Sequence, residues 1–177
     1  MIGVLVSGEG SNLQALLDAG LPVRAVASNR RGVRALERAE AAGVPAAAFE
    51  LTGFPTREAR DLAMAAWLAD HGVQVVVCAG YMHLLTAGFL GRFPGQIVNV
   101  HPSLLPDFPG ARAIDEAVEA GVETTGVTVH LVDEGLDTGR VIVQEPVPVE
   151  PRATLEERIH AVEHRLLPKV VGDLCAR

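Results

Sequence analysis

The chain has 177 residues, a length typical of one domain with a single core, and 49% of them are hydrophobic although only 4% are aromatic. Aliphatic residues, mainly alanine, valine and leucine, must therefore fill that core. The formal charge of −7 and the lack of a basic run argue against a protein that coats nucleic acid, whereas one small anionic substrate can still bind in a local cradle.

Short apolar runs alternate with helical patterns along the chain. The runs predict strands at residues 2–6, 23–27, 46–49, 73–79, 97–100, 124–132 and 140–149. Apolar positions at helical spacing predict helices over residues 13–19, about 33–42, 56–71, about 114–120 and 154–174. Strands that alternate with helices favour a mostly parallel sheet covered on both faces, and the two longer final strands favour an antiparallel extension.

No repeat, low-complexity tract or linker interrupts the sequence, so we expect a single domain over residues 1–177. The expected fold is a three-layer α/β arrangement of the Rossmann-like kind, with a mostly parallel twisted sheet, an antiparallel C-terminal extension and a long C-terminal helix. That helix opens with Thr154 and Glu157 at capping-box spacing, and Pro168 should kink it because proline removes one backbone donor.

A glycine-rich loop, SGEGSN at residues 7–12, follows the first strand and opens a helix. Free backbone N–H groups and the positive end of a helix dipole make this a common phosphate site. The loop does not match the dinucleotide-binding fingerprint. Leu13 stands where that fingerprint requires a small residue, and the acidic residue expected about 20 positions later is missing. The loop does not match a P-loop either, so a single phosphate group is the ligand that fits it better. A capped turn without a ligand explains this loop equally well.

Two polar residues interrupt the apolar run at residues 97–102. Asn99 and His101 alternate with Val98 and Val100, so both polar side chains should project from the same face of a strand. Pro102 ends the strand, which places the pair where open α/β sheets bind ligands. Histidine can move a proton near neutral pH, and a carboxamide N–H can donate to a developing oxyanion. Satisfying backbone groups at a strand end is the alternative role.

An acidic, glycine-rich loop at residues 132–139 joins the last two predicted strands. A calcium loop is rejected, because Gly135 and Thr138 occupy positions where an acid or asparagine and a glycine are required. One carboxylate, that of Asp137, could reach His101, raise its pKa and fix its tautomer. A solvated acidic turn is the alternative.

The two cysteines, Cys78 and Cys175, are far apart and neither forms a C-x-x-C pair, which argues against a zinc ribbon or a disulfide framework. No apolar run approaches the roughly 18 residues that span a bilayer, and no basic signal segment opens the chain. We therefore expect a soluble, reduced domain located in the cytoplasm.

Four motifs in this order resemble the folate-dependent formyltransferases: SGEGSN at 7–12, AGYMHLL at 79–85, NVHPSLLPDFPG at 99–110 and LDTG at 136–139. The likeness runs from residue 2 to about 171, and the glycine-rich loop is similar to that of the members acting on a small ribonucleotide. The resemblance implies transfer of a formyl group from 10-formyltetrahydrofolate, as a co-substrate and without a metal, to the amine of glycinamide ribonucleotide in purine synthesis. Residues 1–98 would form the nucleotide-phosphate half, and residues 99–177 the folate and catalytic half.

The resemblance also implies residue roles. It makes His101 the general acid, Asn99 the oxyanion donor and Asp137 the residue that holds and charges His101 and places a water. The remaining implied contacts are Gly10, Ser11, Asn12 and Glu163 for the ribonucleotide, and Arg57, Met82, His83, Leu84, Leu85, Asn99 and Asp137 for the folate. It suggests a cis bond between Leu105 and Pro106. His83 stands where arginine is usual, Arg140 stands where proline is frequent, and Glu9 should point to solvent.

Three other functions remain as alternatives. Hydrolysis of formyltetrahydrofolate usually involves an added regulatory domain, and formylation of initiator methionyl-tRNA needs a basic C-terminal domain. We expect neither domain in 177 residues of net charge −7. A non-catalytic nucleotide-binding module would not need Asn99, His101 and Asp137 together. The expected partners are small-molecule substrates, with neither nucleic acid nor membrane, and the chain is expected to be a monomer or a homodimer.

Overall fold

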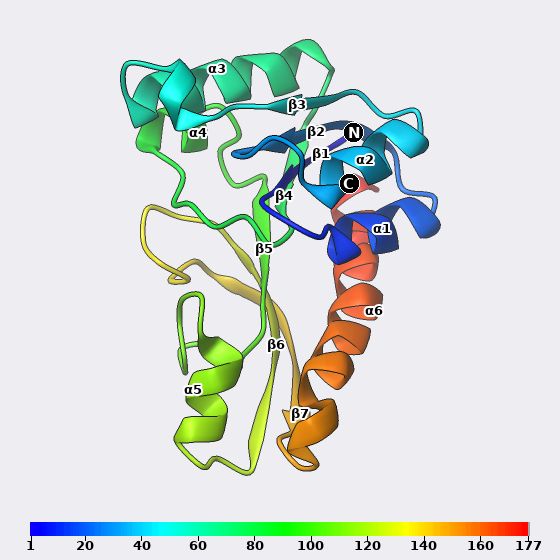
Figure 1. The fold of residues 1–177 in the computed structure, drawn as a ribbon, viewed down its shortest axis with the longest axis vertical. Helices are drawn as coiled ribbons and strands as arrows, with labels where there is room; N and C mark the ends of the chain where they lie inside the picture. Colours follow the sequence, from blue (N-terminus) through cyan, green and yellow to red (C-terminus); the bar gives the residue numbers. More distant parts are fainter. Residues whose placement is uncertain (177) are drawn as a thin grey trace.

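A seven-stranded sheet forms the centre of the structure, a computed structural model that describes residues 1–176. Its strands are β1 (Ile2–Val6), β2 (Val23–Ser28), β3 (Ala46–Ala48), β4 (Val75–Cys78), β5 (Ile97–His101), β6 (Thr124–Leu131) and β7 (Val141–Pro148). They lie in the order β3-β2-β1-β4-β5-β6-β7 (Figure 1). Strands β1 to β5 pair in parallel, whereas β6 pairs antiparallel with β5 and β7. The predicted parallel sheet with an antiparallel extension is confirmed.

Helices cover both faces of the sheet, as the pattern predicted. They are α1 (Ser11–Asp18), α2 (Arg34–Ala41), α3 (Arg57–Asp70), α4 (Ala87–Leu90), α5 (Ala113–Glu119) and α6 (Leu155–Cys175). Helices α1, α2 and α6 share one apolar cluster with the sheet, which includes the fully buried Leu13, Leu16 and Ile159. Helices α3 and α4 share a second cluster, which includes Met64 and Phe89. Burying each such side chain stabilises the fold by about 1.5–3 kcal/mol.

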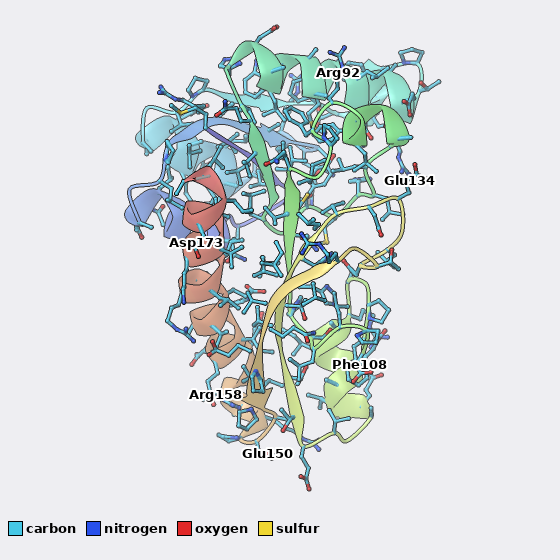
Figure 2. All side chains as sticks on the ribbon, turned by 180° about the vertical axis from the view of Figure 1, so that it is seen from behind. Arg92, Phe108, Glu134, Glu150, Arg158 and Asp173 are labelled. Carbon is cyan, nitrogen blue, oxygen red and sulfur yellow. The ribbon has the colours of Figure 1, made fainter. Side chains whose placement is uncertain are left out.

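The antiparallel extension gives the molecule its elongated outline. In Figure 1, β6 and β7 run away from β1–β4 together with the first turns of α6, and α5 lies beside β6. Side chains fill the space between α6 and the sheet (Figure 2). Val98 and Val100 on β5 belong to the cluster beneath α6, which turns Asn99 and His101 to the opposite face of the strand.

Local details differ from the sequence-based expectations in two places. The capping box at Thr154 is wrong: its side chain makes no cap hydrogen bond, because a 3-10 turn (Arg152–Thr154) leads into α6. The Thr154 hydroxyl instead donates to Pro151 O at 3.3 Å. The short helix α4 and a 3-10 turn at Leu51–Gly53 lie in segments for which no element was predicted.

The expected cis bond between Leu105 and Pro106 is confirmed, and a second cis bond joins Glu150 to Pro151. Within residues 1–176, no helix combines the length and the continuous apolar character needed to cross a bilayer.

Candidate active site

A cavity of about 570 Å³ opens at the carboxyl ends of β1, β4 and β5. The strand order reverses between β1 and β4, and such a reversal is where open α/β sheets bind ligands. The 7–12 loop, the 80–85 loop and the 132–139 loop all contribute to the cavity wall, together with one face of α6. Three predicted motifs that lie far apart in the sequence therefore meet at one site.

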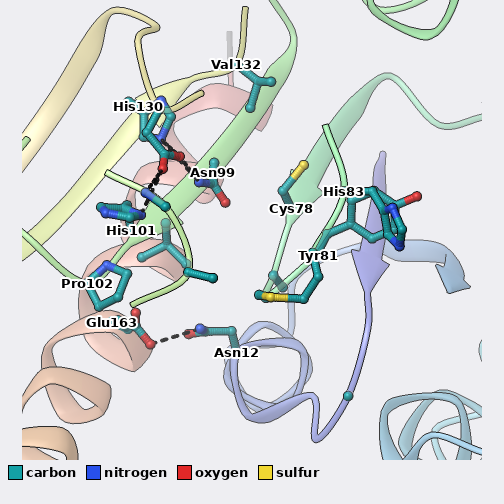
Figure 3. Close-up of a pocket in the computed structure, with 18 of the residues that line it drawn as sticks. Asn12, Cys78, Tyr81, His83, Asn99, His101, Pro102, His130, Val132 and Glu163 are labelled. Carbon is teal, nitrogen blue, oxygen red and sulfur yellow. Dashed lines mark hydrogen bonds and ion pairs between the residues drawn. The ribbon is translucent and has the colours of Figure 1, made fainter. Parts of the chain in front are cut away.

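Asp137 is the centre of the polar network in this cavity. Figure 3 shows three residues of this network, Asn99, His101 and His130, close to one another. Its Oδ2 atom accepts a hydrogen bond from Gly110 N–H at 2.8 Å and lies 3.4 Å from His101 Nδ1. Its Oδ1 atom accepts from Asn99 Nδ2 at 3.3 Å. Burial alone would raise the pKa of Asp137, but His130, the Gly110 N–H and the nearby His101 outweigh it and hold this pKa below its usual value. The carboxylate therefore stays ionised beside His101.

Both ring nitrogens of His101 face oxygen acceptors. Nε2 lies 2.8 Å from Phe108 O, and because a carbonyl oxygen can only accept, this nitrogen carries the hydrogen. Nδ1 faces the Asp137 carboxylate. Two donor positions aimed at two acceptors suit the protonated imidazolium, which is the form that can deliver a proton to a substrate. The structure thus brings Asn99, His101 and Asp137 together, as the sequence predicted.

His130 is a member of this network that sequence reasoning missed. Strand register places it opposite Asn99. Its Nδ1 lies 2.8 Å from Leu131 O, and its Nε2 lies 3.2 Å from Asn99 Nδ2. His130 Nε2 also lies 3.6 Å from Asp137 Oδ1. The available signal was a single ionisable side chain in β6, in phase with Thr128 and alternating with Val127 and Val129.

The 7–12 loop depends on a glycine in the left-handed region. Gly10 has a φ of +75°, and a Cβ atom there would lie 2.6 Å from Ala35 Cβ. This absence of a side chain lets α1 begin close against α2. The carboxylate of Glu9 is exposed, as expected, and pairs with Arg34 at 3.0 Å and Arg38 at 2.8 Å. The first-turn N–H groups of α1 at Ser11 and Asn12 have no intrahelical partner and border the cavity.

The structure brings together Asn12 and Glu163, two of the residues for which a ribonucleotide contact was predicted. Asn12 Nδ2 donates to Glu163 Oε2 at 3.0 Å, and both side chains are buried. Burial raises the pKa of Glu163, while the Asn12 hydrogen bond and His160 act in the opposite direction. Asn12 Oδ1 is buried without a hydrogen-bond partner among the described residues, so it can accept from a ligand hydroxyl.

The predicted folate contacts divide into two groups. Met82, His83, Leu84 and Leu85 line the cavity, whereas Arg57 is exposed at the start of α3 and does not line it. Burial, and then the charges of Arg60 and Arg57, lower the pKa of His83, so Arg57 acts on this wall through its charge. Cys78 also borders the cavity, and burial raises its pKa to about 12, which keeps it a thiol.

The cavity wall carries neither lysine nor arginine among residues 1–176, and its basic side chains are all histidines. His160 is one of them and was missed by sequence reasoning. Glu156, His160 and Glu163 lie on one face of α6 at a spacing of four and three residues, a polar counterpart to the apolar stripe that predicted the helix. The part of the chain that the structure describes contains no cluster of three or more acidic, histidine or cysteine side chains able to hold a metal ion.

A group of acid–base side chains at the carboxyl ends of parallel strands, next to a glycine-rich loop that opens a helix, is an arrangement typical of ligand-binding α/β enzymes. Comparison with known proteins narrows this class. The chain belongs to the formyl transferase family, which matches residues 1–171. The resemblance inferred from the four motifs is thereby confirmed.

Relatives of two sizes match this chain. The phosphoribosylglycinamide formyltransferase of Mycobacterium tuberculosis is 47% identical over 178 residues, which cover 97% of this chain and 83% of the relative. The trifunctional purine biosynthetic protein adenosine-3 of Chironomus tentans is 43% identical over 181 residues, and the match spans 96% of this chain but 13% of that protein. The crystal structure of phosphoribosylglycinamide formyltransferase from Streptococcus pneumoniae is similar with a TM-score of 0.93 at 43% identity, covering 98% of this chain and 97% of that one.

Proposed function

We propose that this chain transfers a formyl group from 10-formyltetrahydrofolate to the glycine amine of glycinamide ribonucleotide, in purine biosynthesis. One observation carries the proposal: Asp137 lies 3.4 Å from His101 Nδ1 and 3.3 Å from Asn99 Nδ2, and all three border one cavity with the 7–12 loop. The names of the relatives that this chain resembles over most of their length support the same reaction.

His101 is the general acid of this proposal. As the acceptor amine bonds to the formyl carbon, the carbonyl oxygen becomes negatively charged and needs a hydrogen-bond donor. His101 then delivers a proton to the folate nitrogen, whose bond to that carbon breaks. The amine loses one proton in exchange, and Asp137 positions the water that takes it. One carbon–nitrogen bond forms and one breaks, so no side chain has to act as a nucleophile.

Asn99 is the oxyanion donor. Its Nδ2 atom already contacts Asp137 at 3.3 Å and His130 at 3.2 Å. Since an amide nitrogen has two hydrogens, Asn99 must exchange one of these contacts for the substrate oxygen as the negative charge develops.

The two substrates bind at opposite ends of the cavity in this proposal. Main-chain N–H groups at Gly10, Ser11 and Asn12 hold the phosphate, and Glu163 accepts from the ribose. The folate lies on Met82, His83, Leu84 and Leu85 beside Asn99 and Asp137. Arg57 adds a long-range attraction for the acidic tail of the folate rather than a direct contact.

Residues 1–98 thus serve mainly the nucleotide and residues 99–177 mainly the catalysis, with the 80–85 loop serving the folate from the first half. The reaction needs small-molecule partners only, and the proposed location is the cytoplasm. From the sequence we predict that the chain is a monomer or a homodimer.

The test mixes the protein with the formyl donor and follows deformylated folate by its absorbance, with and without glycinamide ribonucleotide. Release that depends on the acceptor is expected. Equal release without the acceptor would assign the chain to formyltetrahydrofolate hydrolysis instead, and no release in either mixture would refute the proposal.

A further inference from the structure

The 80–85 loop is held by a single hydrogen bond. All six of its residues line the cavity, and none belongs to a helix or strand. Within residues 1–176, the one hydrogen bond that this loop makes with the rest of the protein runs from Met82 N–H to Ser7 Oγ, at 2.9 Å. Its position therefore depends on side-chain packing and on one serine.

Ser7 is buried and hydrogen-bonded. It follows β1 directly, the residue is 5% exposed, and its hydroxyl donates to Asn29 Oδ1 at 2.6 Å. Because the hydroxyl hydrogen is directed to Asn29, a lone pair remains for Met82 N–H. Ser7 does not line the cavity. Any effect that it has on a substrate must therefore pass through its neighbours.

Ser7 is also the first residue of the 7–12 loop. The next residues of that loop are tied to α2, since Gly8 O accepts from Ala35 N–H at 3.0 Å and Glu9 O accepts from Arg38 Nε at 2.9 Å. By contrast, the end of the 80–85 loop is held from α3, where Thr86 N–H donates to the buried Asp61 at 2.9 Å. Ser7 is thus the hydrogen-bonded link between these two loops, both of which line the cavity.

We propose that Ser7 is a positioning residue shared by both substrates, so that a ligand on the 7–12 loop orders the 80–85 loop through Met82 and the two substrates bind cooperatively. This inference rests on the proposed function, which assigns the acceptor to the first loop and the formyl donor to the second. Ordering one loop lowers the entropic cost of the second binding event. By linkage, each substrate must then raise the affinity for the other by the same factor.

The first measurement is amide hydrogen exchange of residues 80–85. Glycinamide ribonucleotide alone should slow exchange in this segment of the unmodified protein, although the ribonucleotide binds at the other end of the cavity. In Ser7→Ala the ribonucleotide should no longer protect the segment. Equal protection in both proteins would overturn the proposal.

The second measurement is steady-state kinetics. Ser7→Ala should raise KM for 10-formyltetrahydrofolate about fivefold, the size expected for one neutral hydrogen bond, and change kcat less. The dissociation constant of the ribonucleotide should fall about fivefold when tetrahydrofolate is present in the unmodified protein, and this ratio should approach one in Ser7→Ala.

Ser28→Ala is the matched control. Ser28 is also buried, and its hydroxyl also accepts a backbone N–H, that of Arg30 at 3.1 Å, but among the described residues it makes no side-chain hydrogen bond to either loop. It should lose similar stability without a change in KM or in the binding ratio. Asn29→Ala, which keeps Ser7 but removes its acceptor, should shift KM in the same direction by less, and covers the case in which Ser7→Ala does not fold.

The outcomes separate the two claims. If the unmodified protein transfers formyl groups but Ser7→Ala and Ser28→Ala behave alike, the link through Ser7 is refuted and the proposed function stands. If the unmodified protein neither transfers nor binds the ribonucleotide, the proposed function fails and this inference fails with it.

Discussion

Asp137 illustrates what single residues contribute to this site. It adopts a φ of +54°, a conformation that asparagine and aspartate tolerate better than most residues, and so turns its carboxylate back toward β5. Strand alternation alone predicted that Asn99 and His101 share a face. It could not predict His130, because the register of β6 against β5 depends on contacts across the sheet that no local pattern encodes.

Replacing Asp137 by asparagine keeps the shape and the permitted backbone conformation but removes the charge next to His101. We expect kcat to fall by about 10²- to 10⁴-fold, the usual contribution of acid–base assistance, with KM for the ribonucleotide nearly unchanged. Glu134→Gln is the control, since Glu134 is exposed in the same loop and does not line the cavity. Steady-state kinetics of both variants tests this prediction. An equal fall in kcat in the two variants would contradict it, because the charge of the loop alone would then explain the effect.

Glu163 makes folding stability depend on pH. Because burial raises its pKa in the folded state, the folded protein binds this proton more tightly than the unfolded chain, so this residue lowers stability as pH rises through the two pKa values. Glu163→Gln cannot ionise and keeps an acceptor for Asn12. It should therefore be more stable than the unmodified protein at pH 7.5, and the difference should shrink at pH values below the ordinary glutamate pKa.

Urea unfolding at the two pH values measures this difference. Glu156→Gln, on the exposed part of the same face of α6, should show no such pattern. A Glu163→Gln variant that is less stable at both pH values would contradict the assigned direction.

At the scale of elements, periodicity predicted most helices and strands to within a few residues, because apolar spacing reflects burial on one face. End effects were less predictable. The Thr154 hydroxyl donates to Pro151 O and accepts from Arg158 Nε, so it caps no backbone N–H group of α6.

Gly10 allows the start of α1 to lie close to Ala35 of α2. Gly10→Ala combines a positive φ with a Cβ atom 2.6 Å from Ala35 Cβ, so it should cost roughly 1–3 kcal/mol or more of unfolding free energy. Gly20→Ala is a matched control, with a φ of +67° but no atom within 4 Å of the added Cβ, and should cost only the backbone strain. Adding Ala35→Gly should recover part of the loss in Gly10→Ala. Urea denaturation of all four proteins would contradict this account if both glycine variants lost the same stability.

At the scale of the whole molecule, the site exists because the strand order brings β1, β4 and β5 together. Alternating elements predicted the fold class and the antiparallel extension, but not that the 7–12 loop and the 132–139 loop would face one cavity; that expectation came from the family resemblance. Arg57 was expected at the folate site and lies outside the cavity wall, because the start of α3 is exposed rather than turned toward the sheet.

In the proposed function, the cavity holds both substrates while a formyl group passes between them. The most direct test supplies 10-formyltetrahydrofolate carrying ¹³C in the formyl carbon, together with glycinamide ribonucleotide, and locates the label by NMR. The proposed function predicts that the label appears on the glycine nitrogen of the ribonucleotide, with tetrahydrofolate released in equal amount. Label found in free formate, or retained on the folate, would contradict it.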